Sequence, residues 1–161
     1  MTSNFWKGIQ DFLLPGRADD ELCLGPAEAL IHAHRLISQL ADQIDAHAAR
    51  APYPHVARQL RQIATEKRDT ANWLRIMIEN MGERPGQALA DLKLAHNHWQ
   101  ELNLDLEDQI ALEDFLLRQE STMRGETSVA ATLEKLRELQ KPHRRILTGL
   151  IGLADPQANQ S

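Results

Sequence analysis

Two helical stretches of the sequence each carry a pair of polar residues, three positions apart, inside an otherwise apolar stripe. The first pair is Lys67 and Thr70, and the second is Gln140 and His143. Because burying polar groups is costly unless hydrogen bonds satisfy them, two matched pairs indicate one shared site at the centre of a helical bundle. Together they offer an ammonium, a hydroxyl, an amide and an imidazole. This set favours hydrogen bonding over the binding of metal cations.

Two further polar residues lie on or beside the apolar faces of the other helical stretches, counted at about 100° per residue. A fold-back at Pro52 sets His34 opposite Thr70. A second fold-back, between the last two stretches, sets Glu113 near Gln140. The six residues can therefore meet in a metal-free polar network. The predicted polar network comprises His34, Lys67, Thr70, Glu113, Gln140 and His143.

In this network the Lys67 ammonium would neutralise the Glu113 carboxylate, and the remaining groups would complete the hydrogen bonds. A second interpretation stays open, in which Lys67 extends between the helices to solvent and forms no network. Three other imidazoles are expected at the solvated surface. They belong to His32, His47 and His55.

Four long helices must position these residues, and turn residues mark their ends. Pro26 suits a first helical turn, the Pro-Tyr-Pro run at 52–54 breaks the chain, and Gly82 suits a C-cap. Pro142 lies inside the fourth helix and is expected to kink it beside the polar pair. The predicted helices cover 26 to the break at 52–54, about 55–81, about 104–123 and about 127–153.

The connection between the second and third helices is long, at residues 83–103. A connection of this length inside a compact domain needs a structural reason, and a crossover along the bundle supplies one. The chain is thus predicted to be all-α, a four-helix up-and-down bundle with one long crossover, over residues 26–153. Within the connection a short helical pattern runs through Ala88, Leu92, Ala95 and Trp99. The third helix is expected to present Leu106, Ile110, Glu113, Leu117 and Glu120 to the core.

A short amphipathic helix is predicted ahead of the bundle, within residues 1–25, and a polar tail follows it over 154–161. The helix either packs on the bundle itself or docks onto a protein partner. Contact with a membrane surface is less favoured, because Lys7 and Asp11 do not make a strongly basic face. The docking candidates, which fall at helical spacing, are Phe5, Trp6, Ile9, Phe12 and Leu13.

Composition argues against several classes of function. The 161 residues carry a formal net charge of −5 with both signs interspersed, so no basic surface for nucleic acid is expected. The single Cys23 excludes an internal disulfide and a thiolate metal cluster. No apolar run approaches the roughly 20 residues that span a bilayer, and no secretion signal is obvious. We expect a cytoplasmic protein with a protein partner or self-association.

At its polar residues the sequence resembles the rubrerythrin-like branch of the ferritin superfamily. The run Ile63-Ala64-Thr65-Glu66-Lys67-Arg68-Asp69-Thr70, with Leu74 four residues later, is similar to the family's helix-B pattern, in which Ile-Ala precedes Glu-x-x-His. In that register Lys67 stands at the position of the bridging Glu, and Thr70 at that of the His. Gln140-Lys-Pro-His143, with Leu147 four residues later, resembles the helix-D counterpart.

The resemblance implies a ferritin-like bundle whose di-iron centre is degenerate. The helix-A ligand position would fall at about His34, and the helix-C position at Glu113 or Glu107. Because most ligand positions hold other residue types, we expect no cofactor. The expected role is that of a binding, scaffold or assembly protein rather than an enzyme.

An alternative register takes Glu66 and Asp69 as the helix-B pair, an arrangement that suits hard metal ions. The chain would then be an iron-binding oxidoreductase or an iron-handling protein; a mononuclear site would use His34, Glu113 and His143. A small organic ligand inside the bundle is a third hypothesis. The alternative metal ligands are His34, Glu66, Asp69, Glu107, Glu113 and His143.

Overall fold

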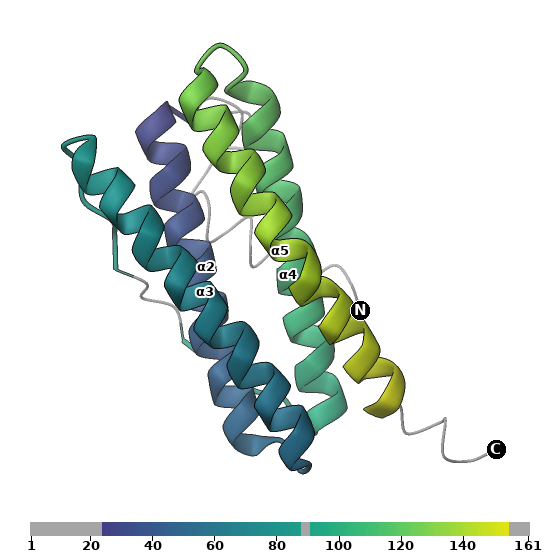
Figure 1. Ribbon diagram of the computed structural model, residues 1–161. Helices are drawn as coiled ribbons and strands as arrows, with labels where there is room; N and C mark the ends of the chain where they lie inside the picture. The colour runs from purple at the N-terminus through teal and green to yellow at the C-terminus, as the bar shows by residue number, and fades with distance from the viewer. Residues whose placement is uncertain (1–23, 88–90, 155–161) are drawn as a thin grey trace.

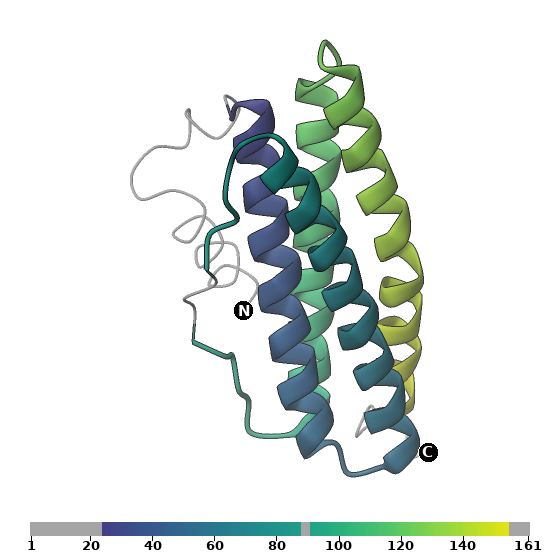
Figure 2. The same cartoon turned by 60° about the vertical axis from the view of Figure 1, so that its left-hand side comes forward.

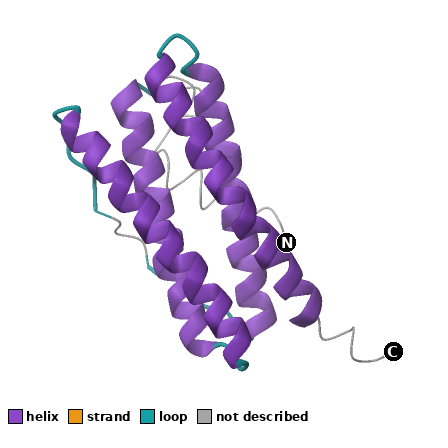
Figure 3. Ribbon diagram, viewed as in Figure 1, coloured by secondary structure: helices purple, strands orange, loops and turns teal. Residues whose placement is uncertain are grey.

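The computed structural model describes residues 24–87 and 91–154, and four long helices make up most of these described residues. Figure 1 labels the helices, and Figure 3 shows that the rest of the described chain is loop. The predicted all-α, four-helix class is therefore confirmed. The helices are α2 (Pro26–Arg50), α3 (Pro54–Asn80), α4 (His98–Thr122) and α5 (Thr127–Ala154).

The helix ends follow from local chemistry. Pro26 and Pro54 each occupy a first helical turn, where the missing N–H of proline would have no partner in any case. Gly82, which follows the C-cap residue Met81 of α3, has a φ of 80°, a conformation that glycine adopts without strain. The Asn97 side chain caps α4 by accepting a hydrogen bond of 2.9 Å from the backbone N–H of Gln100.

The helices form two antiparallel hairpins, α2 with α3 and α4 with α5, and the hairpins pack on each other chiefly through α2 and α4. Figure 2 shows the crossover running along the outer side of α2 from the end of α3 to the start of α4. The predicted long crossover is thus confirmed. α5 remains helical through Pro142. No helix among the described residues is long and apolar enough to cross a membrane.

The prediction of a short helix in the crossover is wrong for the part of the crossover that the structure describes. Residues 91–97 are not helical, Ala88 lies outside the described residues, and Trp99 belongs to α4. The carbonyl groups of Lys93 and Ala95 accept hydrogen bonds from side chains of α2 instead of from a helical turn. These side chains hold the segment extended against α2.

The predicted inward face of α4 is displaced by one residue. Leu117, expected in the core, is 48% exposed, and Glu120 pairs with Arg137 at 2.9 Å. The error has a physical cause, because several inward positions of α4 are polar and weaken the apolar periodicity. The buried face of α4 includes Leu102, Asp105, Gln109, Leu112, Leu116 and Gln119.

Candidate functional site

Lys67 lies at the centre of the bundle and is 0% exposed. Its ammonium Nζ donates hydrogen bonds to Oε1 of Gln109, at 2.7 Å, and to Oε1 of Gln140, at 2.5 Å. The two amide side chains come from α4 and α5, so this contact joins three helices. The alternative in which Lys67 extends out to solvent is therefore wrong.

Burial changes the protonation of this amine. Removal from water disfavours the charged form and lowers the pKa of Lys67 from 10.5 to about 7. The carboxylates of Glu113, Asp105 and Glu66 oppose that shift. Lys67 is thus poised between its charged and neutral forms near neutral pH.

Glu113 is a buried residue of α4, as Gln109 is, but its carboxylate does not pair directly with the Lys67 ammonium. Among the described residues no ion pair joins Glu113 to Lys67, so the expected direct neutralisation is not what the geometry shows. Burial raises the pKa of Glu113, and the nearby charges of Arg144 and Lys67 act in the opposite direction. Lys67 therefore acts on Glu113 through its charge and not through direct contact.

His143 of α5 is also buried, and its imidazole contacts Glu66 of α3. Its Nε2 lies 2.7 Å from Oε2 of Glu66, a carboxylate that is 46% exposed. Burial and the neighbouring charge of Lys67 lower the pKa of His143 to about 4, despite the contact with Glu66. The ring is therefore neutral near pH 7, with its proton on Nε2 and its lone pair on Nδ1.

Two residues of the predicted network lie apart from it. Thr70 is half-buried, and its hydroxyl donates to the carbonyl oxygen of Glu66 in its own helix at 2.9 Å. His34 is half-buried, its Nδ1 has no hydrogen-bond partner among the described residues, and burial together with Arg75 lowers its pKa. The structure thus brings Lys67 and Gln140 into contact but leaves Thr70 and His34 outside.

Gln109 is the central residue that the sequence prediction missed. Its Oε1 accepts from Lys67, and its Nε2 donates to the backbone carbonyl of Gln140 at 3.1 Å. The available signal was a polar residue every fourth position along α4, which places these side chains on one face. That series is Glu101, Asp105, Gln109 and Glu113.

The residues at the centre do not fit a di-iron group. A protonated amine has no lone pair to give to a metal, and the two oxygens nearest to it belong to neutral amides. Of the alternative ligands, Asp69 is exposed, and Glu107 is half-buried beside Asp108 and Lys93. Within residues 24–87 and 91–154 no group of three or more His, Cys, Asp or Glu side chains is arranged to hold a metal ion.

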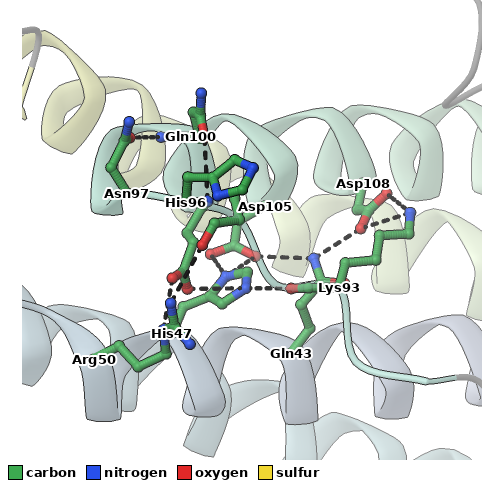
Figure 4. A network of polar contacts seen from close by, with 11 residues as sticks. Gln43, His47, Arg50, Lys93, His96, Asn97, Gln100, Asp105 and Asp108 are labelled. Carbon is green, nitrogen blue, oxygen red and sulfur yellow. Dashed lines mark hydrogen bonds and ion pairs between the residues drawn. The ribbon is translucent and has the colours of Figure 1, made fainter.

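A second buried polar cluster, shown in Figure 4, ties α2 to α4 and to the crossover. His47 is 0% exposed, so its expected place at the solvated surface is wrong. Its Nδ1 lies 2.8 Å from both carboxylate oxygens of Asp105, and its Nε2 donates to the carbonyl of Lys93 at 2.6 Å. We call this cluster the crossover latch. It comprises Gln43, His47, Arg50, Lys93, Glu101, Asp105 and Asp108.

The latch matches each buried charge with a partner of opposite sign. Arg50 pairs with Glu101 at 2.8 Å, and Lys93 pairs with Asp108 at 3.0 Å. Burial alone would lower the pKa of His47, but the hydrogen bond and charge of Asp105 raise it. Because the Nε2 proton of His47 is directed at a backbone carbonyl, the His-Asp pair stabilises the crossover and activates no nucleophile.

The arrangement of helices defines a ferritin-like fold: two antiparallel hairpins joined by one long crossover. A bacterioferritin structure from Rhodobacter capsulatus, with a metal-free dinuclear site and heme iron, matches it with a TM-score of 0.73. The match covers 88% of this chain and 89% of that chain at 19% identity. No protein-family model and no curated protein matches the sequence. The comparison establishes the fold alone.

Proposed function

We propose that this ferritin-like bundle works without a di-iron centre, as a binding, scaffold or assembly protein. The observation that carries the proposal is the buried Lys67 ammonium, held between the amide oxygens of Gln109 and Gln140. Di-iron chemistry needs several carboxylates to balance two divalent ions. Here an ammonium puts a positive charge where a cation would have to enter.

The electrostatics of the centre support the same proposal. Glu113, Asp105 and Glu66 each favour the charged form of Lys67, which is the kind of negative field that attracts a cation. The ammonium supplies that positive charge from within the chain. The carboxylates therefore have a partner without a metal.

A role in binding or assembly is supported by apolar side chains on the outer surface. Ile76 on α3, Leu117 on α4 and Leu139 on α5 are all exposed large hydrophobic residues. Such residues are candidates for contact with a second copy or with another protein. The proposed docking residues Phe5, Trp6, Ile9, Phe12 and Leu13 lie outside the described residues, so their role stays a prediction.

A second candidate function is iron binding with a non-standard ligand set. The contact of 2.7 Å between His143 and Glu66 favours it, because it brings an imidazole and a carboxylate together from two helices. Asp69, however, is exposed, and Lys67 occupies the space beside the pair. We therefore rank this candidate below the metal-free one.

Iron loading of designed variants tests the proposal. The variant Lys67→Glu, Thr70→His, Gln140→Glu restores the ligand types of the resembled pattern around Glu113 and His143. Both proteins are mixed with Fe(II) under anaerobic conditions, desalted and analysed for metal. At pH 6, below the pKa of about 7 for Lys67, we expect stoichiometric iron in the variant and only traces in the wild-type protein, because the ammonium repels the ion and occupies the amide oxygens of Gln109 and Gln140.

The control is the variant Arg58→Glu, Asn80→Asp, which makes the same change of formal charge at exposed positions of α3. It should bind no more iron than the wild type. Stoichiometric iron in wild-type protein purified from its native host would contradict the proposal. Loss of that iron in a Glu113→Ala variant that still folds would establish iron binding, the second candidate function.

A further inference from the structure

His47, in the crossover latch, faces hydrogen-bond acceptors at both nitrogens of its ring, as Figure 4 shows. Its Nδ1 lies 2.8 Å from both carboxylate oxygens of Asp105. Its Nε2 lies 2.6 Å from the carbonyl oxygen of Lys93 and 3.2 Å from Oε2 of Glu101. A neutral imidazole has one N–H group, whereas an imidazolium has two. Only the charged ring can therefore donate hydrogen bonds on both sides at once.

Loss of one proton would affect the two sides of the ring unequally. The remaining proton stays on Nδ1, because the carboxylate of Asp105 is a stronger acceptor than a neutral backbone carbonyl. Nε2 would then direct a lone pair at the carbonyl oxygen of Lys93, at a distance that suits a hydrogen bond only when a hydrogen lies between the two atoms. The contact that deprotonation breaks is thus the one between α2 and the crossover.

Charged and titratable groups from three elements surround the His47 ring. Within the described residues, α3 forms no hydrogen bond or ion pair with it. The surrounding groups are Glu101, Asp105 and His98 of α4, Arg50 of α2, which pairs with Glu101, and Lys93 of the crossover, whose ammonium pairs with Asp108.

These surroundings favour the charged ring. Burial acts to lower the pKa of His47, but the hydrogen bond and charge of Asp105, the Lys93 carbonyl and the charge of Glu101 raise it above its ordinary value of 6.5. Burial lowers the pKa of His98, so that imidazole is neutral in the pH range where His47 is charged. The electrostatics therefore agree with the geometry.

We propose that protonated His47 holds the crossover against α2 and α4, and that loss of its proton releases the crossover at Lys93. The segment can move without opening the core, because Leu92 and Leu94, on either side of Lys93, are exposed. The inference does not depend on the proposed function, since it uses no contact of Lys67.

The direction of the pH dependence follows from the raised pKa. In the released state the ring is solvated and titrates near 6.5, whereas in the closed state it holds its proton to a higher pH. The stabilisation by His47 is therefore fully present below pH 6.5 and is lost as the pH rises through the raised pKa. Between these two values the opening equilibrium should rise by up to about tenfold per pH unit.

Trypsin cleavage after Lys93 measures this opening, because the carbonyl of the cleaved bond is the group that His47 holds. Initial rates of cleavage are measured on the full chain between pH 6 and pH 9. Each rate is divided by that of a synthetic peptide of residues 91–98, which removes the pH dependence of trypsin itself. We expect the normalised rate to rise by about tenfold or more across this range.

Two substitutions of histidine by glutamine identify the group that titrates. His47→Gln should cleave faster than the wild type at pH 6 and show no rise with pH, because an amide does not titrate. The matched control is His96→Gln, which removes an exposed imidazole of the same crossover and should keep the wild-type rise. Thermal unfolding of each variant checks that the bundle is folded.

Several results would overturn the proposal. One is a flat wild-type profile, and another is a rise that persists in folded His47→Gln or disappears in His96→Gln. A fall in cleavage with rising pH would assign the titration to Asp105 or Asp108, carboxyls whose pKa burial raises. If His47→Gln does not fold, ¹⁵N NMR of the wild-type ring decides: both nitrogens of His47 should carry protons at pH 6.5, and a neutral ring at that pH would refute the proposal.

Discussion

Lys67 shows how strongly the charge of one side chain depends on its surroundings. The amine donates to two neutral amide oxygens and is shielded from water on all sides. Amide oxygens compensate the charge less well than water does, and for this reason the pKa of Lys67 falls to about 7. The residue thus links the stability of the fold to pH.

The sign of this link follows from proton binding. The unfolded chain holds the Lys67 proton up to a pKa near 10.5, whereas the folded chain releases it near 7. Between these values the unfolded state binds more protons, so this group makes the free energy of unfolding rise with pH, by up to about 1.4 kcal/mol per pH unit. We expect urea unfolding at pH 7, 8 and 9 to show this rise in the wild type relative to Lys67→Met. If the free energies of unfolding of the two proteins changed in parallel with pH, the lowered pKa of Lys67 would be contradicted.

At the residue scale, sequence patterns identified some of the central side chains and missed others. Lys67 and Gln140 were recognisable because each interrupts an apolar stripe. Gln109 was not, since α4 has so many polar positions that one more buried amide does not stand out. Thr70 was misplaced because a threonine hydroxyl can be satisfied by its own helix, which spacing alone does not reveal.

At the scale of elements, proline and glycine determined what could be predicted. Pro26, Pro54 and Gly82 mark helix ends through backbone chemistry, so α2 and α3 were predicted nearly to the residue. α4 begins about two turns earlier than expected, at His98. Its first turns and the crossover are organised by the latch, whose partners are far apart in the sequence and leave no local pattern.

The latch gives a prediction for stability. Asp105→Asn should lower the free energy of unfolding by about 3–5 kcal/mol, because it leaves the buried His47 without its charged partner. The control is Asp42→Asn, which weakens an exposed pair with Arg68 and should cost less than about 1 kcal/mol. Urea unfolding at pH 6 measures both. Similar effects of the two changes would mean that the latch is not a principal contact between α2, α4 and the crossover.

At the scale of the whole molecule, the bundle leaves large apolar side chains uncovered on three helices. Ile76, Leu117 and Leu139 are each more than two-fifths exposed, which leaves apolar area available for contact with a second chain. We expect light scattering after size-exclusion chromatography to give a mass above the 18.2 kDa of one chain. A mass of one chain at tens of micromolar would contradict self-association and leave a different protein as the partner.

The long-range position of the latch also bears on the order in which the molecule folds. Each helical hairpin closes through contacts that are close in sequence, whereas His47 and Asp105 are 58 positions apart and meet only after a large loop has closed. Contacts that form after the folding barrier slow unfolding and leave the folding rate almost unchanged. We therefore expect the latch to set mainly the unfolding rate, and so the lifetime of the assembled bundle, while the hairpins set how fast it forms.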